Sequence, residues 1–273
     1  MNKFYTAKND KVFKAIMMRN QKILKAIIES ILKIEIDEIL ILNSELPITY
    51  VRSKKRIVDL LIKSKDKYIN VELNPSFKKE HVYRNLTYVF NIYSNKIQSG
   101  ERYSSLMYSE FIGINLSYGL NKSKIKEEYK IQSNSNKEYV KNFKIIEIDM
   151  DKIRKDWYIL SSEEKNEYKY LYMLDLNKEE LKINVRGDRI MKEFEEEVNK
   201  INQDEQFKYF LTDEEDGENL YESGLIIAKN EGLEEASINI AKKLLQENIT
   251  IDKIAEITNL PIEEIINLKT ENK

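Results

Sequence analysis

Two short segments of alternating polarity constrain the fold of this chain more than any other feature. Apolar residues occupy every second position in residues 57–62 and again in residues 68–74, and a polar run separates the two segments. Such alternation is typical of β-strands that bury one face. The pattern therefore predicts a β-hairpin, with its turn between Lys65 and Asp66 and its second strand ending before Pro75.

The predicted hairpin would bring two acidic residues together on its polar face. If the turn is centred as expected, position 62 faces 69, position 60 faces 71, and Asp59 faces Glu72. Side chains directly opposite each other in such a pair have Cβ atoms about 5 Å apart. Two carboxylates at that separation repel each other unless a cation lies between them. A turn of odd length would break this register.

The composition narrows the chemistry that an acidic site would perform. The chain contains no cysteine and a single histidine, His81. Thiolate nucleophiles, cysteine-based zinc sites, disulfides and histidine-rich metal sites are therefore excluded. Carboxylates with a hard cation, Mg²⁺ or Mn²⁺, remain, and this combination polarises phosphates and activates water.

Spacing alone does not establish such a site. The motif Asp-x12-Glu-x-Asn, formed by Asp59, Glu72 and Asn74, is weak, because acidic residues on strands are common. Taken by themselves, these residues favour the simpler interpretation that Asp59 and Glu72 are exposed on the solvated face of a hairpin.

Charge is distributed unevenly, although the net charge is only −2. Residues 1–110 carry an excess of Lys and Arg, including Lys55 and Arg56, whereas the remainder is acidic. A basic half is expected to contact a polyanion such as DNA. A chance distribution of surface lysines explains the asymmetry equally well.

Periodicity predicts the other elements. We expect helices on both sides of Asn20 within the first 33 residues, then a strand at 39–42, a helix at 79–97, and strands at 106–116 and 143–150. The helix at 79–97 is expected to bury Val82, Leu86, Val89, Tyr93 and Ile97. The second half reads as charged helices, with breaks at Gly217, Gly224 and Gly232 and short helices near the end.

In the order and spacing of its motifs, the chain resembles the Rpn (YhgA-like) recombination-promoting nuclease and putative transposase family, a branch of the PD-(D/E)XK nucleases. The motifs that carry this resemblance are Asp10-Lys11-Val12-Phe13-Lys14, Ile57-Val58-Asp59-Leu60-Leu61, Ile69-Asn70-Val71-Glu72-Leu73-Asn74, Arg84-Asn85-Leu86-Thr87-Tyr88, the stretch at 98–106 and the tail at 254–265.

The resemblance implies an α/β fold with a restriction-endonuclease-like core, a mixed sheet flanked by helices, and a helical C-terminal region. It implies that Asp59 and Glu72 ligate Mg²⁺ or Mn²⁺. The third family position, usually Lys or Gln, is Asn74 here, which can hydrogen-bond a metal-bound water but supplies no positive charge. Lys78, Lys79 and Arg84 are candidates for that charge.

Further residues have two interpretations each. Asp10 matches an acidic residue of the family's first helix, and it also suits a helix N-terminus through the helix dipole. Arg84 and Tyr88 lie one helical turn apart and are expected to hold a phosphate, together with Lys55 and Arg56, or to form a helix face packed on the sheet.

These observations lead to one interpretation and two rivals. We expect a metal-dependent DNA endonuclease, linked to recombination, mobile elements or defence. The rivals are a catalytically silent DNA-binding protein that retains the fold, and a protein-interaction module that uses its acidic helical tail. The expected parts are a core at 1–155, a helical connection at 156–222 and a small helical element at 223–273, which serves as an accessory or homo-oligomerisation element. The absence of an apolar leader or span predicts a cytoplasmic protein.

Overall fold

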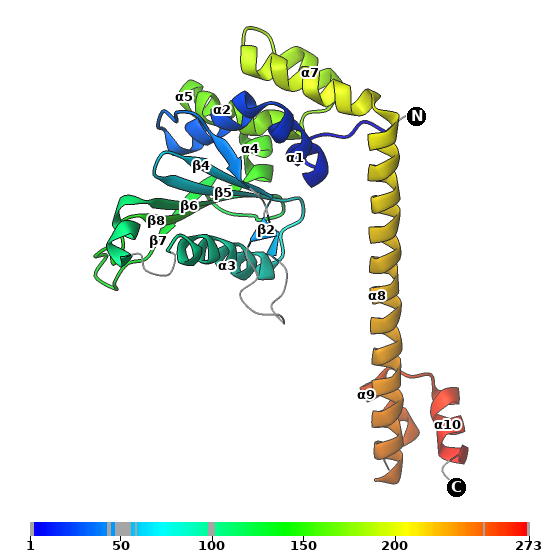
Figure 1. The fold of residues 1–273 in the computed structure, drawn as a ribbon. Helices are drawn as coiled ribbons and strands as arrows, with labels where there is room; N and C mark the ends of the chain where they lie inside the picture. Colours follow the sequence, from blue (N-terminus) through cyan, green and yellow to red (C-terminus); the bar gives the residue numbers. More distant parts are fainter. Residues whose placement is uncertain are drawn as a thin grey trace. The chain divides into compact units, whose positions relative to one another are not determined.

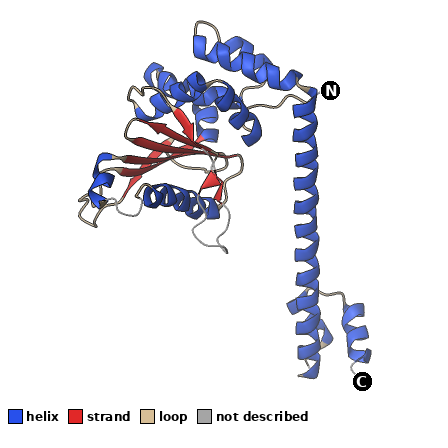
Figure 2. Ribbon diagram, viewed as in Figure 1, coloured by secondary structure: helices blue, strands red, loops and turns tan. Residues whose placement is uncertain are grey.

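The computed structural model describes residues 3–42, 45–46, 56–57, 59–97, 102–247 and 249–271. The chain divides into two compact units, Met1–Glu205 and Gln206–Lys273. The first unit is a layered α/β structure and the second is helical (Figures 1 and 2). Each unit is described below by itself.

A mixed sheet of six strands forms the centre of the first unit. Its strand order is β1-β4-β5-β6-β8-β7. The β5–β6 and β6–β8 pairs are parallel and the other pairs are antiparallel, which confirms the expected mixed sheet. The strand bounds are β1 Leu40–Leu42, β4 Leu60–Ser64, β5 Lys67–Asn74, β6 Glu110–Ser117, β7 Lys126–Lys130 and β8 Phe143–Asp149, and β2 Glu45–Leu46 pairs with β3 Arg56–Ile57 in a separate ribbon.

The predicted hairpin is confirmed as β4 and β5. Leu60 pairs with Val71 and Ile62 with Ile69, and the ladder closes at Ser64, next to the turn at residues 65–66. Lys65 takes the left-handed conformation, with φ 49°, that a tight hairpin turn needs. The strand β5 ends at Asn74, directly before Pro75.

One face of the sheet packs on the helices α1 (Asp10–Arg19), α2 (Gln21–Leu32) and α4 (Met150–Asp156), with α5 (Ser162–Tyr172) and α7 (Arg189–Gln203) packed outside them (Figure 1). Asn20 separates α1 from α2, as expected, and caps α2 with its side chain. The centre of this face is apolar, and the charged residues Lys67, Glu110 and Lys144 lie at one end of it. The sheet residues buried here are Leu60, Ile62, Ile69, Val71, Leu73, Ile112, Ile114, Leu116, Ile146 and Ile148.

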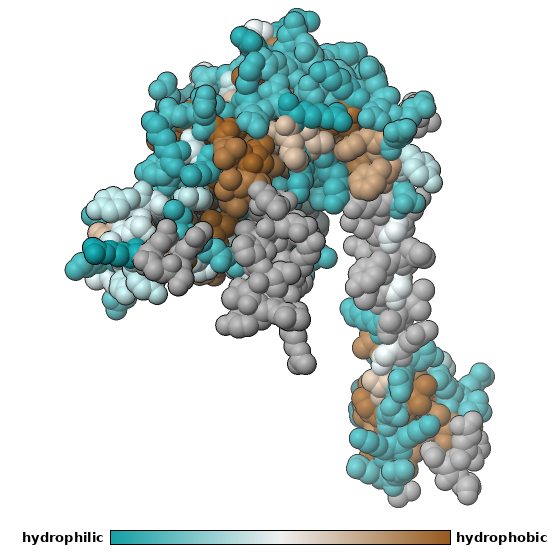
Figure 3. Space-filling view, viewed as in Figure 1, coloured by the Kyte–Doolittle hydropathy of each residue, from teal (hydrophilic) through white to brown (hydrophobic). Residues whose placement is uncertain are grey.

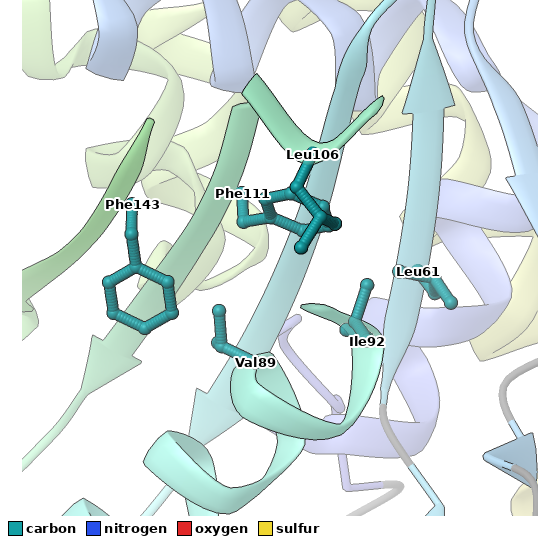
Figure 4. Packing of buried hydrophobic residues seen from close by; sticks show 6 residues of the cluster. All are labelled: Leu61, Val89, Ile92, Leu106, Phe111 and Phe143. Carbon is teal, nitrogen blue, oxygen red and sulfur yellow. The ribbon is translucent and has the colours of Figure 1, made fainter. Parts of the chain in front are cut away.

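The opposite face is covered by α3 (Lys79–Asn95). Close approach of this helix depends on Gly113 of β6, since a Cβ built there would lie 2.8 Å from Cγ2 of Val89. Figure 4 shows the apolar part of this contact, where Val89 and Ile92 of α3 face Phe111 and Phe143 of the strands.

The predicted buried stripe of α3 is wrong at one end. Val82 is 48% exposed, whereas Asn85 and Asn91 are buried. The helix is rotated so that its polar residues meet the sheet, because the sheet residues beneath its first turns are themselves polar, as described below.

The predicted strand at 106–116 begins later than expected. Residues Tyr103–Tyr108 form a short 3-10 helix, and β6 starts at Glu110. The edge strand β7 was not predicted, because its sequence, Lys-Glu-Glu-Tyr-Lys, lacks apolar alternation.

The helical segments after β8 continue the first unit. α6 spans Lys178–Asn184, and a 3-10 turn spans Met173–Asp175. The start of the chain is fixed to α7, because Asn202 accepts a hydrogen bond from the Tyr5 N–H and donates one to the Tyr5 carbonyl, at 2.8 and 2.9 Å. The outer surface of these helices is mostly hydrophilic (Figure 3).

The second unit consists of the long helix α8 (Glu205–Gln246) and two short helices that come after it. The predicted breaks at Gly217, Gly224 and Gly232 are wrong, because a glycine inside a helix costs only about 1 kcal/mol and the surrounding residues are good helix formers. The helices α9 (Ile251–Thr258) and α10 (Ile262–Glu271) share a small apolar core with the end of α8, centred on Ala241, Ile254 and Ile265. Among the described residues, no helix is both long and apolar enough to cross a membrane.

Candidate metal and phosphate site

Asp59 and Glu72 lie side by side at the start of β4. The β4–β5 ladder of backbone hydrogen bonds begins at Leu60. At the preceding residue, Asp59, hydrogen bonds to side chains replace the backbone pairing. The Asp59 N–H donates to Glu72 Oε1 at 3.1 Å, and Asp59 Oδ2 accepts from the Leu73 N–H at 2.9 Å. Each carboxylate is therefore fixed through one oxygen, which leaves it able to offer the other oxygen to a cation.

Glu72 of this acidic pair is buried and Asp59 is partly buried, contrary to the simpler interpretation of a solvated hairpin face. Glu72 is only 2% exposed. Burial, followed by the neighbouring Asp59 charge, raises the pKa of Glu72 to about 8. Burial also raises the pKa of Asp59, a shift opposed by the hydrogen bond from Leu73 and increased by the charge of Asp10. Paired buried carboxylates with raised pKa values indicate a site for a cation, a proton or both.

Arg84 of α3 is the cationic side chain next to this pair. Its Nη2 lies 3.9 Å from Glu72 Oε2 and donates to Asn74 Oδ1 at 2.7 Å. Its side chain is 40% exposed, so the guanidinium is open to solvent on one side. Of the three candidates for the charge that Asn74 does not supply, the described contacts place Arg84 at the acidic pair.

Asn74 connects Arg84 to a second buried carboxylate, that of Glu147. Its Nδ2 donates to Ser117 Oγ at 3.0 Å, and Ser117 Oγ donates to Glu147 Oε1 at 2.6 Å. Asn115 Nδ2 donates to Glu147 Oε2 at 3.2 Å. Because both ends of the Asn74 amide have partners, this residue holds Arg84 in place.

Sequence reasoning missed Ser117, Asn115 and Glu147. Their signal is the polar alternation in the sequence Gly-Ile-Asn-Leu-Ser of β6 and Ile-Ile-Glu-Ile-Asp of β8, which follows the period of Glu72 and Asn74 in β5. The strand register was needed to align them, since Glu72 pairs with Asn115 and Asn115 with Glu147.

Asp10 lies near the acidic pair at the first turn of α1. Its charge raises the pKa of Asp59, while Lys14, one turn further along the helix, lowers it. Asp10 Oδ1 also accepts a hydrogen bond from the Lys11 N–H at 2.8 Å, as expected for an acidic residue at a helix N-terminus. The two interpretations of Asp10 are therefore compatible. Lys14 was not singled out as a site residue from the sequence.

The other predicted DNA-binding residues are less well placed. Arg84 lies 6.0 Å from the ring centroid of Tyr88, at the outer limit of a cation–π contact. Lys55 lies outside the described residues. Arg56 belongs to β3, and only its backbone is described.

A divalent cation fits the donor set of the acidic pair. Mg²⁺ uses one or two carboxylates and retains several waters, so Asp59 and Glu72 suffice as protein ligands. Across the described part of the chain, no cluster of three or more His, Cys, Asp or Glu residues is arranged to hold a metal. Waters or substrate oxygens would therefore complete the coordination.

Fold and site together define an α/β protein with an acidic pair at the open end of the β4–β5 hairpin of a mixed sheet and an arginine beside it. The family model of the PD-(D/E)XK nuclease family transposases matches residues 7–221, and this chain belongs to that family. The match confirms the PD-(D/E)XK nuclease membership expected from the motifs, at the level of the nuclease family transposases. No curated protein and no solved structure gives a significant match.

Proposed function

We propose that this protein is a metal-dependent DNA endonuclease whose site is the Asp59–Glu72 pair. The observation that carries the proposal is a buried glutamate, Glu72, next to a partly buried aspartate, Asp59, with a half-exposed arginine beside them, in a chain of a nuclease family. Bound Mg²⁺ or Mn²⁺ would polarise the scissile phosphate and lower the pKa of a water.

The residues of the chain have separate roles in this proposal. Asp59 and Glu72 hold the cation, and the Leu73 N–H fixes the orientation of Asp59. Arg84 binds a non-bridging phosphate oxygen through its exposed side, because a guanidinium presents several donors in one plane. Asn74 is a positioning residue for Arg84. Asp10 and Lys14 adjust the charge around Asp59.

The alternative of a silent DNA-binding protein is favoured by one observation. Asn74 stands where the family usually has Lys or Gln, and its amide is engaged by Arg84 and Ser117. In this alternative the protein binds DNA with strong salt dependence and does not cleave it.

We further propose that the helical C-terminal region mediates self-association, which the sedimentation of the full chain would test.

Cleavage of a supercoiled plasmid distinguishes the two functions. We expect the purified chain to nick the plasmid in Mg²⁺ or Mn²⁺ but not in EDTA. Glu72→Gln should reduce nicking more than about 100-fold, because removal of a metal ligand has a larger effect than loss of a residue behind it.

The matched control is Glu80→Gln, which changes an exposed glutamate at the start of α3 and should cleave like wild type. Equal nicking by Glu72→Gln and wild type would exclude the assignment. Salt-sensitive DNA binding without nicking in either metal would establish the silent alternative.

A further inference from the structure

A cavity of about 310 Å³ lies beneath α3, beside the candidate site. Such a volume is at the lower end of the range for small-ligand sites, about 300–1,000 Å³. Its walls are largely apolar and include Val82 and Leu86 of α3, Tyr129 of β7 and the side chain of Lys122. Asn115 and Glu147 also line it and are the buried polar groups of the cavity.

The strand register fixes the distance between this cavity and the acidic pair. Glu72, Asn115 and Glu147 occupy one row across β5, β6 and β8. Neighbouring strands are about 4.8 Å apart, so the Glu147 backbone is about 10 Å from that of Glu72. This separation is comparable to one or two nucleotides of a DNA strand. A base next to the cleaved phosphate is therefore within reach of the cavity.

The polar groups of the cavity are hydrogen-bond acceptors. Both oxygens of Glu147 are already oriented, because Ser117 donates to one and Asn115 to the other. Asn115 Oδ1 is buried and has no hydrogen-bond partner among the described residues. The Lys122 ammonium donates to Glu127 and Tyr129. A complementary ligand must therefore present donors to the cavity.

Among the four DNA bases, guanine presents two adjacent donors on its Watson–Crick edge, the ring N–H and the exocyclic amino group. A carboxylate accepts both, and the apolar faces of the base suit the largely apolar wall of the cavity. Tyr129 lines the cavity and is 46% exposed overall, which gives the base an aromatic ring to contact.

We propose that this cavity binds a guanine base of the DNA substrate, turned out of the base stack close to the cleaved phosphate. The proposal rests on the proposed function for the identity of the substrate. Enzymes that read a base in this way insert it in a fitted pocket and recognise its Watson–Crick edge. The cavity would thus give the enzyme a base preference at its cut site.

Binding measured without cleavage tests the cavity separately from the nuclease activity. The probes are fluorescein-labelled oligonucleotides of twelve thymidines in which one central residue is guanine, adenine, cytosine or unchanged, with fluorescence anisotropy read in EDTA. We expect the guanine probe to bind about tenfold more tightly than the all-thymidine probe, as one bidentate contact to a base allows.

Val82→Trp should fill the cavity and remove the guanine preference, while affinity for the all-thymidine probe is retained. Val82 is 48% exposed, so the substitution leaves the folded core in place. Thr87→Trp is the matched control, because Thr87 is also β-branched, exposed and on α3, but does not line the cavity. Tyr129→Ala should weaken the preference by removing the aromatic wall.

Equal affinity for all four probes, absence of binding, or a guanine preference that survives Val82→Trp would overturn the cavity proposal. A guanine preference in a protein that does not nick plasmid would leave the cavity in place and reject the nuclease. Plasmid nicking without any guanine preference would reject the cavity proposal and retain the nuclease.

Discussion

The two faces of the central sheet are built from the same strands but differ in how many polar side chains they bury. In β5, Ile69, Val71 and Leu73 face the α1 and α2 side, whereas Glu72 and Asn74 face the α3 side. Both sets are almost completely buried. A buried apolar residue stabilises the fold through burial, whereas a buried carboxylate destabilises it unless it is paired. The comparison indicates that the α1–α2 side serves stability alone, whereas the α3 side combines an apolar cluster with the polar residues of the proposed site.

The largest expected effect tests the apolar side. Ile114 of β6 is fully buried between Gly113 and Asn115. We expect Ile114→Ala to reduce the free energy of unfolding by about 2–5 kcal/mol, because it leaves a cavity in a packed core. Urea unfolding followed by circular dichroism measures this. Plasmid nicking per folded molecule should be unchanged, and a selective loss of nicking would contradict the division between the faces.

A second prediction concerns the contact between α3 and the sheet. Gly113→Ala places a Cβ at 2.8 Å from Val89 Cγ2, which forces α3 outward. We expect a loss of about 1–3 kcal/mol in stability and a simultaneous loss of nicking, because Arg84 lies on the same helix. The double variant Gly113→Ala with Val89→Ala makes room for the new Cβ and should recover both. If the double variant recovers stability but not nicking, the position of α3 does not control the activity of the site.

A third prediction addresses the polar connection on the α3 side. Ser117→Ala removes the bridge between Asn74 and Glu147. We expect nicking to fall about tenfold, in the range for residues that orient a metal site from behind. Ser117→Thr retains the hydroxyl and is the conservative variant. If Ser117→Ala nicks like wild type, the connection to Glu147 does not position Arg84.

A fourth prediction concerns pH. Because burial and Asp59 raise the pKa of Glu72 to about 8, the folded protein retains a proton that the unfolded chain loses near pH 4.5. Without metal, the contribution of Glu72 to stability is therefore present below about pH 4.5 and is lost as the pH rises towards 8. We expect Glu72→Gln to raise the melting temperature by a few degrees at pH 8 and less at pH 5, in EDTA. Equal shifts at both pH values would exclude a raised pKa.

The sequence predicted the hairpin and its two acidic residues because both depend on local alternation. The pairing of Leu60 with Val71 follows from a two-residue turn, and the same turn brings Asp59 to Glu72. It did not predict that Glu72 is buried, because burial depends on α3, which approaches through Gly113.

The polar residues that connect to Asn74, namely Ser117, Glu147 and Asn115, could not be predicted because their alignment depends on long-range strand pairing. Glu147 is 75 positions away from Glu72 in the sequence, and only the parallel pairing of β5, β6 and β8 aligns them. The rotation of α3 was also missed, because its hydrophobic spacing favours burying Val82, whereas the polar sheet face requires Asn85 there. Long-range register and polar burial are therefore what the sequence alone left open.

Binding of Mn²⁺ tests the central claim, that Asp59 and Glu72 hold a divalent cation. Calorimetric titration at pH 7, in two buffers with different enthalpies of ionisation, measures both metal affinity and proton release. We predict that Mn²⁺ binds the wild-type protein and releases a proton, because the raised pKa of Glu72 keeps the pair partly protonated. Glu72→Gln should lose this binding and Glu80→Gln should retain it. Unchanged Mn²⁺ affinity in Glu72→Gln would contradict the claim.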